Sequence, residues 1–332
     1  MNWKLFFLVR VWLAFSLTCS AQALGYDPLA VNSPAPKTID LTMHDTARNR
    51  DIPIRVYLPT NTAPVPVVLF SHGLGGNLEG SKFLGEHWAV RDYVAVFLQH
   101  PGSDDSVWKN TAAKNRMASM SQAASLENFT RRVKDVPAVL DQLATWNVQT
   151  NSPLAGRMNL QKVGMSGHSF GAVTTEAVSG EIFPGSGQSL TDPRITAAIA
   201  FSPSPPKTGS AAKAFGSVKI PWLLMTGTKD VSPIGKTSVK DRLAVYPNLK
   251  GAPKYEVVLN NAVHSAFTDR ALPGDKEGRN PNYHRVILAV STAFWDAYLK
   301  NDAAAKAWLD GAGPRSVMQA EDQWQSDRKS VV

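Results

Sequence analysis

The chain has 332 residues, of which 43% are hydrophobic and 19% are charged, and its formal net charge is +8. This composition excludes an intrinsically disordered chain, and the length allows one large hydrophobic core or two modest domains. Lys and Arg are scattered, with the longest cluster at 131–134. We therefore interpret the charge as a basic surface and predict no nucleic-acid partner.

The N-terminus has the features of a secretory signal peptide. Lys4 and Arg10 precede an apolar stretch at 11–17, and Ala-Gln-Ala ending at Ala23 is a small-x-small cleavage pattern. We predict a signal peptide at 1–23 and a secreted or periplasmic protein without stable membrane insertion. The alternative is an uncleaved membrane anchor, although the uninterrupted apolar run is too short to span a bilayer.

The only cysteine, Cys19, lies within that segment. The mature protein would therefore have no disulfide, no cysteine nucleophile and no thiolate metal site. The sequence has no His-x-x-x-His or paired-carboxylate pattern, and the glycine-rich turn at 73–76 does not continue into Gly-Lys-Ser/Thr. We expect neither a metal nor a cofactor.

Beyond the signal peptide we predict an extended N-terminal segment at 24–39, a single domain at 40–314 and a loose polar tail at 315–332. An alternating stretch opens the domain, and short apolar runs that end in turn residues follow it. Such runs suit parallel strands that are covered on both faces. The predicted strands lie at 50–59, 67–70, within 93–104, and at 162–165, 195–201, 222–226 and 254–260.

Helices are predicted between these strands. Apolar residues recur at spacings of three and four over 129–146, and Pro137 predicts that the regular helix begins near Asp135, its expected N-cap. Further helices are predicted at 170–178 and 283–299. This alternation predicts an α/β fold, with a mostly parallel sheet, helices on both faces and functional groups on the loops after the carboxyl ends of strands.

The stretch Gly-His-Ser-Phe-Gly at 167–171 joins a predicted strand to a predicted helix. Gly-x-Ser-x-Gly in this context is the nucleophile elbow, a turn so tight that residues flanking the serine must lack bulk. We predict Ser169 as the catalytic nucleophile. The alternative is a serine that only caps the helix.

A serine hydroxyl needs a base to become a nucleophile, and the base needs an orienting acid. Two histidines follow Ser169 in the sequence. His264 comes directly after the strand that ends near residue 260, whereas His284 begins the last predicted helix. We therefore predict His264 as the general base.

The acid should follow a strand between the serine and the histidine. Asp230 lies just past the predicted strand at 222–226, and we predict that it orients His264. The other candidates fit less well: Asp192 precedes a strand, Asp241 lies on a predicted helix, and Asp269 follows the histidine.

The negative oxygen of a tetrahedral intermediate must be met by fixed N–H donors. We predict the backbone N–H groups of Phe170 and of Leu74, which lies in the glycine-rich loop FSHGLGGN. We also expect Leu74, Phe170 and Phe267 to line the substrate pocket. His72 is expected to brace the loop, and His168 to be structural.

The elbow, the FSHGLGG loop, GTKD and AVHSAF together resemble the α/β-hydrolase superfamily over about residues 40–300. FSHGLGG with GHSFGA resembles, more narrowly, the platelet-activating-factor acetylhydrolase-like and bacterial dienelactone-hydrolase-like group. The resemblance implies an α/β-hydrolase fold and a cofactor-free carboxylic ester hydrolase with a Ser-His-Asp triad. The chain departs from the acetylhydrolases in having no carboxylate after the strand at 195–201, and from dienelactone hydrolases in having Ser169 instead of cysteine.

The sequence therefore favours an exported serine esterase that cleaves short or soluble acyl esters through an acyl-enzyme intermediate. The first alternative is a lipase or secreted polyester hydrolase. The insertion at 103–125 could cover the site, but its Lys, Asn, Ser and Ala content favours soluble esters over bulk fat. The second alternative is an inactive hydrolase fold that serves as a binding module.

Overall fold

A computed structural model describes residues 25–31, 33–183, 185–232, 234–271 and 280–327 of the chain. The predicted signal peptide at 1–23 lies outside these residues. No helix within the described ranges is long and apolar enough to cross a membrane.

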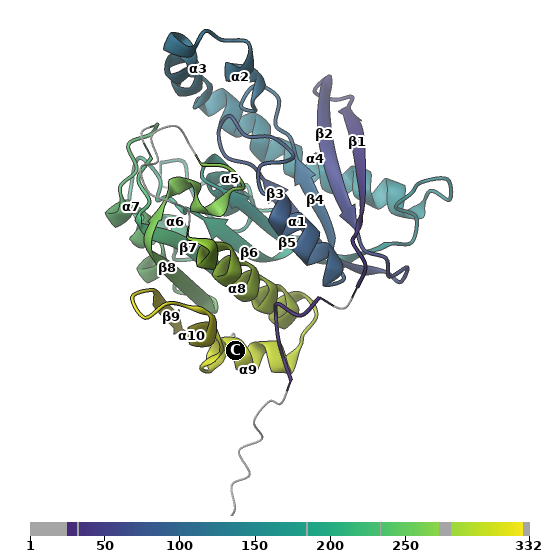
Figure 1. The fold of residues 1–332 in the computed structure, drawn as a ribbon. Coiled ribbons are helices and arrows are strands. Elements are labelled where there is room, and N and C mark those ends of the chain that lie inside the picture. The colour runs from purple at the N-terminus through teal and green to yellow at the C-terminus, as the bar shows by residue number, and fades with distance from the viewer. Residues whose placement is uncertain (1–24, 32, 184, 233, 272–279, 328–332) are drawn as a thin grey trace, which may run out of the picture.

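The strands of the described chain form one nine-stranded sheet in the order β1-β2-β4-β3-β5-β6-β7-β8-β9 (Figure 1). Neighbours from β4 to β8 are parallel, and the pairs β1–β2, β2–β4 and β8–β9 are antiparallel. The strands are β1 (Lys37–Asp45), β2 (Arg50–Leu58), β3 (Val65–Ser71), β4 (Val94–Leu98), β5 (Met158–His168), β6 (Ile195–Phe201), β7 (Trp222–Lys229), β8 (Lys254–Val263) and β9 (Gln323–Asp327).

Helices cover both faces of the sheet. On one face lie α1 (Lys82–Val90) and α8 (Pro281–Leu299), and on the other lie α4 (Leu126–Val148) and α5 (Phe170–Val178) (Figure 1). The shorter α-helices are α2 (Ser106–Lys109), α3 (Arg116–Ala123), α6 (Ala211–Phe215), α7 (Val239–Leu243), α9 (Ala303–Asp310) and α10 (Gly313–Val317). The 3₁₀ turns are η1 (Ala113–Asn115), η2 (Tyr246–Asn248) and η3 (His264–Phe267).

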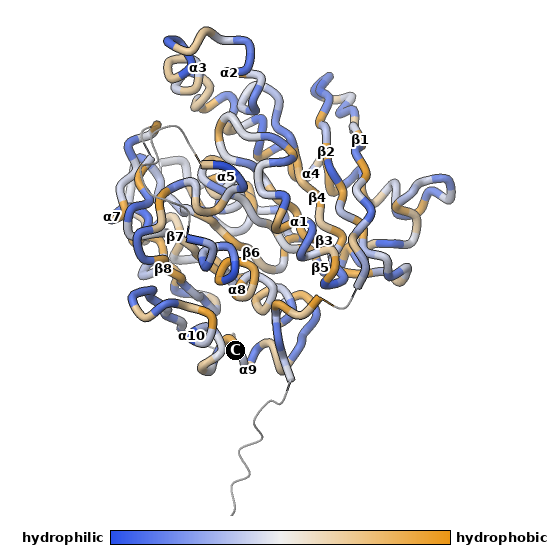
Figure 2. The backbone as a smooth tube through the Cα atoms, viewed as in Figure 1, coloured by the Kyte–Doolittle hydropathy of each residue, from blue (hydrophilic) through white to orange (hydrophobic). Residues whose placement is uncertain are grey.

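The core explains why the strands are almost continuously apolar. Successive side chains of a strand point to opposite faces, so in β3 Val68 and Phe70 pack with α1 and α8, whereas Val67 and Leu69 pack with α4. Apolar residues accordingly concentrate along the central strands (Figure 2). Both faces of these strands are buried, which is the arrangement expected of a parallel sheet with helices on each side.

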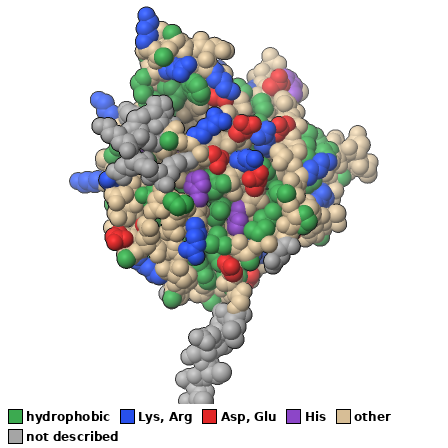
Figure 3. All heavy atoms as spheres, in the orientation of Figure 1, with side chains coloured by type: hydrophobic (Ala, Val, Ile, Leu, Met, Phe, Trp, Pro, Cys, Tyr) green, Lys and Arg blue, Asp and Glu red, His purple; other side chains and the backbone are tan. Residues whose placement is uncertain are grey.

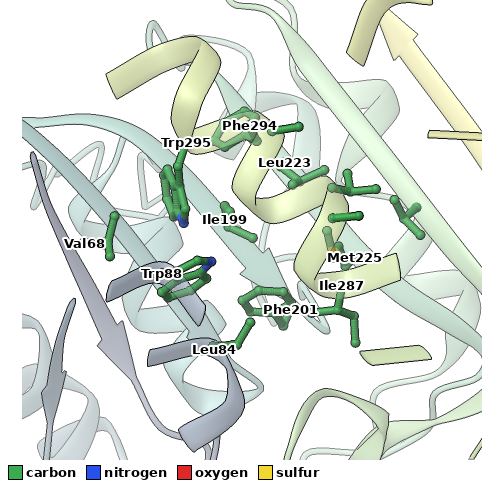
Figure 4. Close-up of a cluster of buried hydrophobic side chains, with 14 of the residues drawn as sticks. Val68, Leu84, Trp88, Ile199, Phe201, Leu223, Met225, Ile287, Phe294 and Trp295 are labelled. Carbon is green, nitrogen blue, oxygen red and sulfur yellow. The ribbon is translucent and has the colours of Figure 1, made fainter. Parts of the chain in front are cut away.

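Aromatic side chains fill the layer between α8 and the sheet. Trp88 of α1 and Trp295 of α8 are fully buried, and their rings meet edge to face with centroids 5.9 Å apart (Figure 4). Phe201, the last residue of β6, packs in the same cluster. Burying one large apolar side chain contributes about 1.5–3 kcal/mol to the free energy of folding. The packing of this layer therefore stabilises the position of the sheet's central strands, including the end of β6 at Phe201.

The sheet order and the two helical layers are those of the α/β-hydrolase fold, which confirms the predicted fold class. The predictions for β2, β6, α5 and α8 are also confirmed to within a few residues. On the face that Figure 3 shows, Lys and Arg side chains are interspersed with acidic ones rather than gathered into one basic patch.

The predicted start of α4 is wrong. The helix begins at Leu126, with Ser125 as its N-cap, and continues through Pro137. Asp135 is not a cap: it is completely buried in mid-helix, where Arg50 and His100 bind its carboxylate. The apolar face of the 23-residue helix and these buried contacts outweigh the cost of about 3 kcal/mol for an internal proline.

Both ends of the predicted domain also differ. β1 begins at Lys37, inside the segment predicted to be only extended, and β9 adds residues of the predicted loose tail to the sheet edge. Residues 323–327 of this tail are held on the sheet because their backbone pairs with β8 and Trp324 stacks on Tyr255, with ring centroids 5.6 Å apart. A polar sequence concealed this pairing, since backbone hydrogen bonds need no apolar side chains.

Candidate active site

The candidate site lies where the parallel strands end. Parallel strands present their carboxyl ends at a single edge of a sheet. Ser169 follows β5, Asp230 follows β7, and His264 follows β8. The turn at 72–77, here called the oxyanion loop, follows β3 at the same edge.

Ser169 has the strained backbone of a nucleophile elbow, with φ of 57° and ψ of −112°. The flanking glycines are sterically required. A Cβ on Gly167 would lie 2.3 Å from the Gly171 carbonyl oxygen, and a Cβ on Gly171 would lie 1.8 Å from that of Ser71. The structure therefore brings the serine between β5 and the N-terminus of α5, against the end of β3.

The three predicted side chains meet. His264 Nε2 lies 2.8 Å from Ser169 Oγ, and His264 Nδ1 lies 2.7 Å from Asp230 Oδ1. In a neutral ring, Nδ1–H donates to the carboxylate and Nε2 accepts the serine proton. Ser169 is partly exposed, whereas Asp230 is completely buried. This is the arrangement of a nucleophile, a base and an orienting acid.

The surroundings of Asp230 keep it ionised. Burial alone would raise its pKa, but hydrogen bonding and charge from His264, together with the charge of Arg242, lower the pKa of Asp230 to about 2. Its second carboxylate oxygen accepts hydrogen bonds from Ser202 over 2.7 Å and from Thr226 over 2.8 Å. An ionised acid at neutral pH can hold the His264 Nδ1–H.

A second serine, Ser202, also lies near His264 and Asp230, but it contacts the acid and not the base. Ser202 Oγ donates to Asp230 rather than contacting His264 Nε2, and Ser202 is completely buried. Its φ of 60° places it in the left-handed region at the end of β6. Ser202 therefore supports the acid, and Ser169 is the serine that His264 can deprotonate.

Arg242 was missed by the sequence reasoning. It lies in α7, 1% exposed, and its Nε is 2.8 Å from Asp230 Oδ1, while Nη1 donates to the Ser202 carbonyl over 2.7 Å. Arg242 thus fixes both the acid and the turn after β6. A single arginine in a short polar helix gives no sequence signal for such a contact.

The rejected acids lie elsewhere. Asp192 binds Arg194 on the turn before β6, and Asp241 caps α7. Asp269 accepts the backbone N–H of Lys82. His284, the alternative base, stacks on Phe83 with ring centroids 3.7 Å apart.

The two predicted oxyanion donors flank the serine. Phe170 is the first residue of α5, so its N–H belongs to the helix-terminal donors that have no partner within the helix. Leu74 is half-buried in the oxyanion loop, and within the described residues its N–H meets no acceptor. A Cβ on the neighbouring Gly73 would lie only 3.5 Å from Ser169 Cβ, so the loop backbone passes close to the nucleophile.

The supporting histidines are buried. His72 Nδ1 lies 2.6 Å from the Gly73 carbonyl oxygen, and His168 Nε2 lies 3.0 Å from the carbonyl oxygen of His264. Burial lowers the pKa of both rings well below the usual value, so both are neutral. They hold the backbone around the site, as the sequence predicted.

The prediction that Phe267 lines the substrate pocket is wrong. Phe267 is completely buried in the core, with its ring centroid 6.0 Å from that of His168 and 5.9 Å from that of Phe201. It therefore presents no surface to a substrate. The 3₁₀ turn η3 directs its side chain under the site rather than into it.

The insertion at 103–125 packs onto the oxyanion loop. Trp108 Nε1 donates to the Gly75 carbonyl over 2.7 Å, and a Cβ on Gly75 would overlap the Met120 sulfur. Half-buried Trp108 thus forms a wall beside the loop. The sequence analysis considered that the insertion could cover the site, but it did not identify Trp108.

Within the described ranges, no group of three or more His, Cys, Asp or Glu side chains could hold a metal ion. A surface groove of about 600 Å³ lies between the β1–β2 turn and the start of α4, lined by residues including Arg48, Arg131 and Lys134. None of the triad residues lines it.

Comparison with known proteins agrees with this assignment of the fold. No curated protein matches the sequence. The narrower resemblance to acetylhydrolases and dienelactone hydrolases stays a prediction. A family model described as PET hydrolase-like matches residues 117–274, just under half of the chain, and the matched segment contains Ser169, Asp230 and His264.

Proposed function

We propose that the protein is an exported serine hydrolase that cleaves carboxylic ester bonds through an acyl-enzyme intermediate on Ser169. The observation that carries this proposal is the chain of hydrogen bonds from Ser169 Oγ through His264 to the buried Asp230 carboxylate. The elbow geometry adds support, as do the N–H groups of Leu74 and Phe170, which meet no acceptor among the residues that the structure describes.

The chemistry follows from the geometry. Ser169 Oγ attacks the ester carbonyl while its proton moves to His264 Nε2, and Asp230 stabilises the resulting imidazolium. The N–H groups of Leu74 and Phe170 bind the oxyanion, and loss of one such donor costs about 3–4 kcal/mol. The imidazolium then gives its proton to the leaving alcohol. Water, deprotonated by His264, attacks the acyl-enzyme in the same way and releases the acid.

Two substrate classes follow from different observations. The polar insertion at 103–125, docked on the oxyanion loop through Trp108, favours short or soluble acyl esters. The PET hydrolase-like match, which includes the triad, favours ester bonds of a polyester chain as the second candidate. Both classes present an ester carbonyl that needs no metal-bound water.

The test is a substrate panel measured on the mature chain and on Ser169→Ala. We expect the wild type to hydrolyse short p-nitrophenyl esters, with long-chain esters and polyester film separating an esterase, a lipase and a polyester hydrolase. Ser169→Ala should lose the activity. No hydrolysis by the folded wild type would leave the inactive binding module as the better account. Export predicts a mature N-terminus at Leu24, which N-terminal sequencing would read.

A further inference from the structure

Two buried histidines behind the oxyanion loop take no part in the mechanism above. His72 is 2% exposed and His100 is completely buried. His72 follows β3 and His100 follows β4, so both lie at the sheet edge that carries the site. Their hydrogen bonds determine how the loop presents its backbone.

The tautomer of His72 is set by its partners. The backbone N–H of His100 donates to His72 Nε2 over 3.1 Å. Because a backbone N–H can only donate, Nε2 carries the lone pair, and in the neutral ring Nδ1 carries the proton. Nδ1–H therefore donates to the Gly73 carbonyl oxygen, 2.6 Å away. Burial and the charge of Arg132 lower the pKa of His72, which keeps this ring neutral.

This hydrogen bond acts on the peptide group that bears the predicted oxyanion donor. The Gly73 carbonyl and the Leu74 N–H belong to one planar, trans peptide group, so they point in opposite directions. The N–H of Gly76 donates to the same carbonyl over 3.0 Å. Two donors thus hold the carbonyl on the His72 side of the loop and direct the Leu74 N–H away from it. Donors to a carbonyl also polarise the N–H of the same group.

A second Ser-His-Asp arrangement holds His100 in turn. His100 Nδ1 lies 2.9 Å from Asp135 Oδ2, and His100 Nε2 lies 2.9 Å from Ser71 Oγ. All three residues are completely buried, so no substrate can reach them. Burial, followed by the charge of Arg132, lowers the pKa of His100 to about 4. The neutral ring therefore donates its Nδ1–H to Asp135 and accepts a hydrogen bond from the Ser71 hydroxyl at Nε2.

Arg132 connects this network to the second oxyanion donor. Its Nη2 donates to Ser71 Oγ over 3.0 Å and to the His72 carbonyl, and its Nε donates to Thr174 of α5 over 3.1 Å. The guanidinium carbon lies 4.6 Å from the centroid of the Phe170 ring. Arg132 is completely buried, and its contacts connect the oxyanion loop with α5 on the side away from solvent.

We propose that His72 is a positioning residue for the Leu74 oxyanion donor, and that the buried Ser71–His100–Asp135 network fixes His72 in the tautomer this role requires. His72 acts through the Gly73 carbonyl and does not touch the substrate. The proposal rests on the proposed function, because an oxyanion forms only where Ser169 attacks a carbonyl.

Two substitutions separate the two hydrogen bonds of His72. His72→Asn keeps an N–H near the position of Nδ1, so it can still donate to Gly73, whereas His72→Gln reaches only the Nε2 position. On a p-nitrophenyl ester we expect His72→Gln to lose about 30–100-fold in kcat with KM within about threefold, and His72→Asn to stay within about fivefold of wild type. The affinity for a boronic acid, which mimics the tetrahedral intermediate, should fall in parallel with kcat.

His87→Gln is the matched control. His87 is also buried, but its Nε2 contacts the Pro28 carbonyl oxygen away from the site, and glutamine can replace that contact. We expect wild-type kcat from this variant. Equal losses in His72→Asn and His72→Gln, or wild-type kcat and boronic-acid affinity in a folded His72→Gln, would overturn the positioning role alone.

The tautomers can be read without any activity. Long-range ¹H–¹⁵N spectra of the wild-type imidazoles should show the Nδ1–H form for His72 and for His100, unchanged between pH 6 and 8. An Nε2–H tautomer for His72 would overturn the proposal even if the variants failed to fold. If wild type and Ser169→Ala were equally inactive on every ester, the proposed function would fail and the positioning role with it.

Discussion

Gly171→Ala tests how closely the nucleophile elbow packs against the end of β3. The added Cβ would lie 1.8 Å from the Ser71 carbonyl oxygen, where contacts below 3.0 Å are essentially never found. The two segments must therefore separate by about 1.2 Å. Overpacking of this kind costs about 1–3 kcal/mol, which corresponds to roughly 2–10 °C in Tm. The same displacement moves Ser169 away from the oxyanion loop, and a misplacement of about 1 Å can cost 10²-fold in rate.

The assay measures kcat/KM on a short p-nitrophenyl ester together with Tm. Gly185→Ala is the control, because a Cβ on Gly185 meets nothing within 4 Å and its φ is not in the left-handed region. We expect about a 100-fold loss of kcat/KM and a lower Tm for Gly171→Ala, and neither for Gly185→Ala. A Gly171→Ala variant with wild-type kcat/KM and Tm would refute the close approach on which the elbow argument depends.

Further outcomes follow from the polar groups around the sheet. Asp230→Asn should lose about 10³–10⁴-fold in kcat by leaving His264 in the wrong tautomer. Ser202→Ala removes one of several hydrogen bonds to the acid and should lose about tenfold or less in kcat. A loss in Ser202→Ala as large as that in Asp230→Asn would contradict these two roles. Burial raises the pKa of Glu256 to about 7. The neutral form therefore supports folding at low pH, and this support is lost as the pH rises from the unfolded value, near 4.5, through 7. In urea unfolding, Glu256→Gln should have the same free energy of unfolding as wild type at pH 4.5, and one up to about 3 kcal/mol higher at pH 8. Equal free energies of unfolding at pH 8 would contradict this prediction.

The alternation of strands and helices could be predicted because strands that are buried on both faces of the sheet consist of continuous apolar runs. β6 and α5 have the predicted bounds for this reason. α4 was mispredicted at its start because local rules treat Pro137 as a helix boundary, whereas packing against the sheet and the buried Asp135 contacts keep the helix intact. β9 could not be predicted from the sequence because its mostly polar residues join the sheet through backbone pairing with β8, which leaves no apolar pattern.

The triad candidates could be found from the sequence because each directly follows a predicted strand. Parallel strand ends converge, so chain position alone predicts that Ser169, Asp230 and His264 lie close together. The buried partners carry no such signal. Arg242 contacts Asp230 from a short helix, and Arg132 of α4 donates to the His72 carbonyl of the oxyanion loop. Both contacts depend on how the helices pack against the sheet.

The role of Ser169 as the single activated nucleophile can be measured directly by labelling with a fluorophosphonate and mapping the adduct by mass spectrometry. Trypsin separates the two serines near the dyad, because Ser169 falls in the peptide 163–194 and Ser202 in the peptide 195–207. We predict one adduct, on Ser169 in the first peptide, that disappears in Ser169→Ala and persists in Ser202→Ala. An adduct on Ser202, or undiminished labelling of Ser169→Ala, would contradict the account.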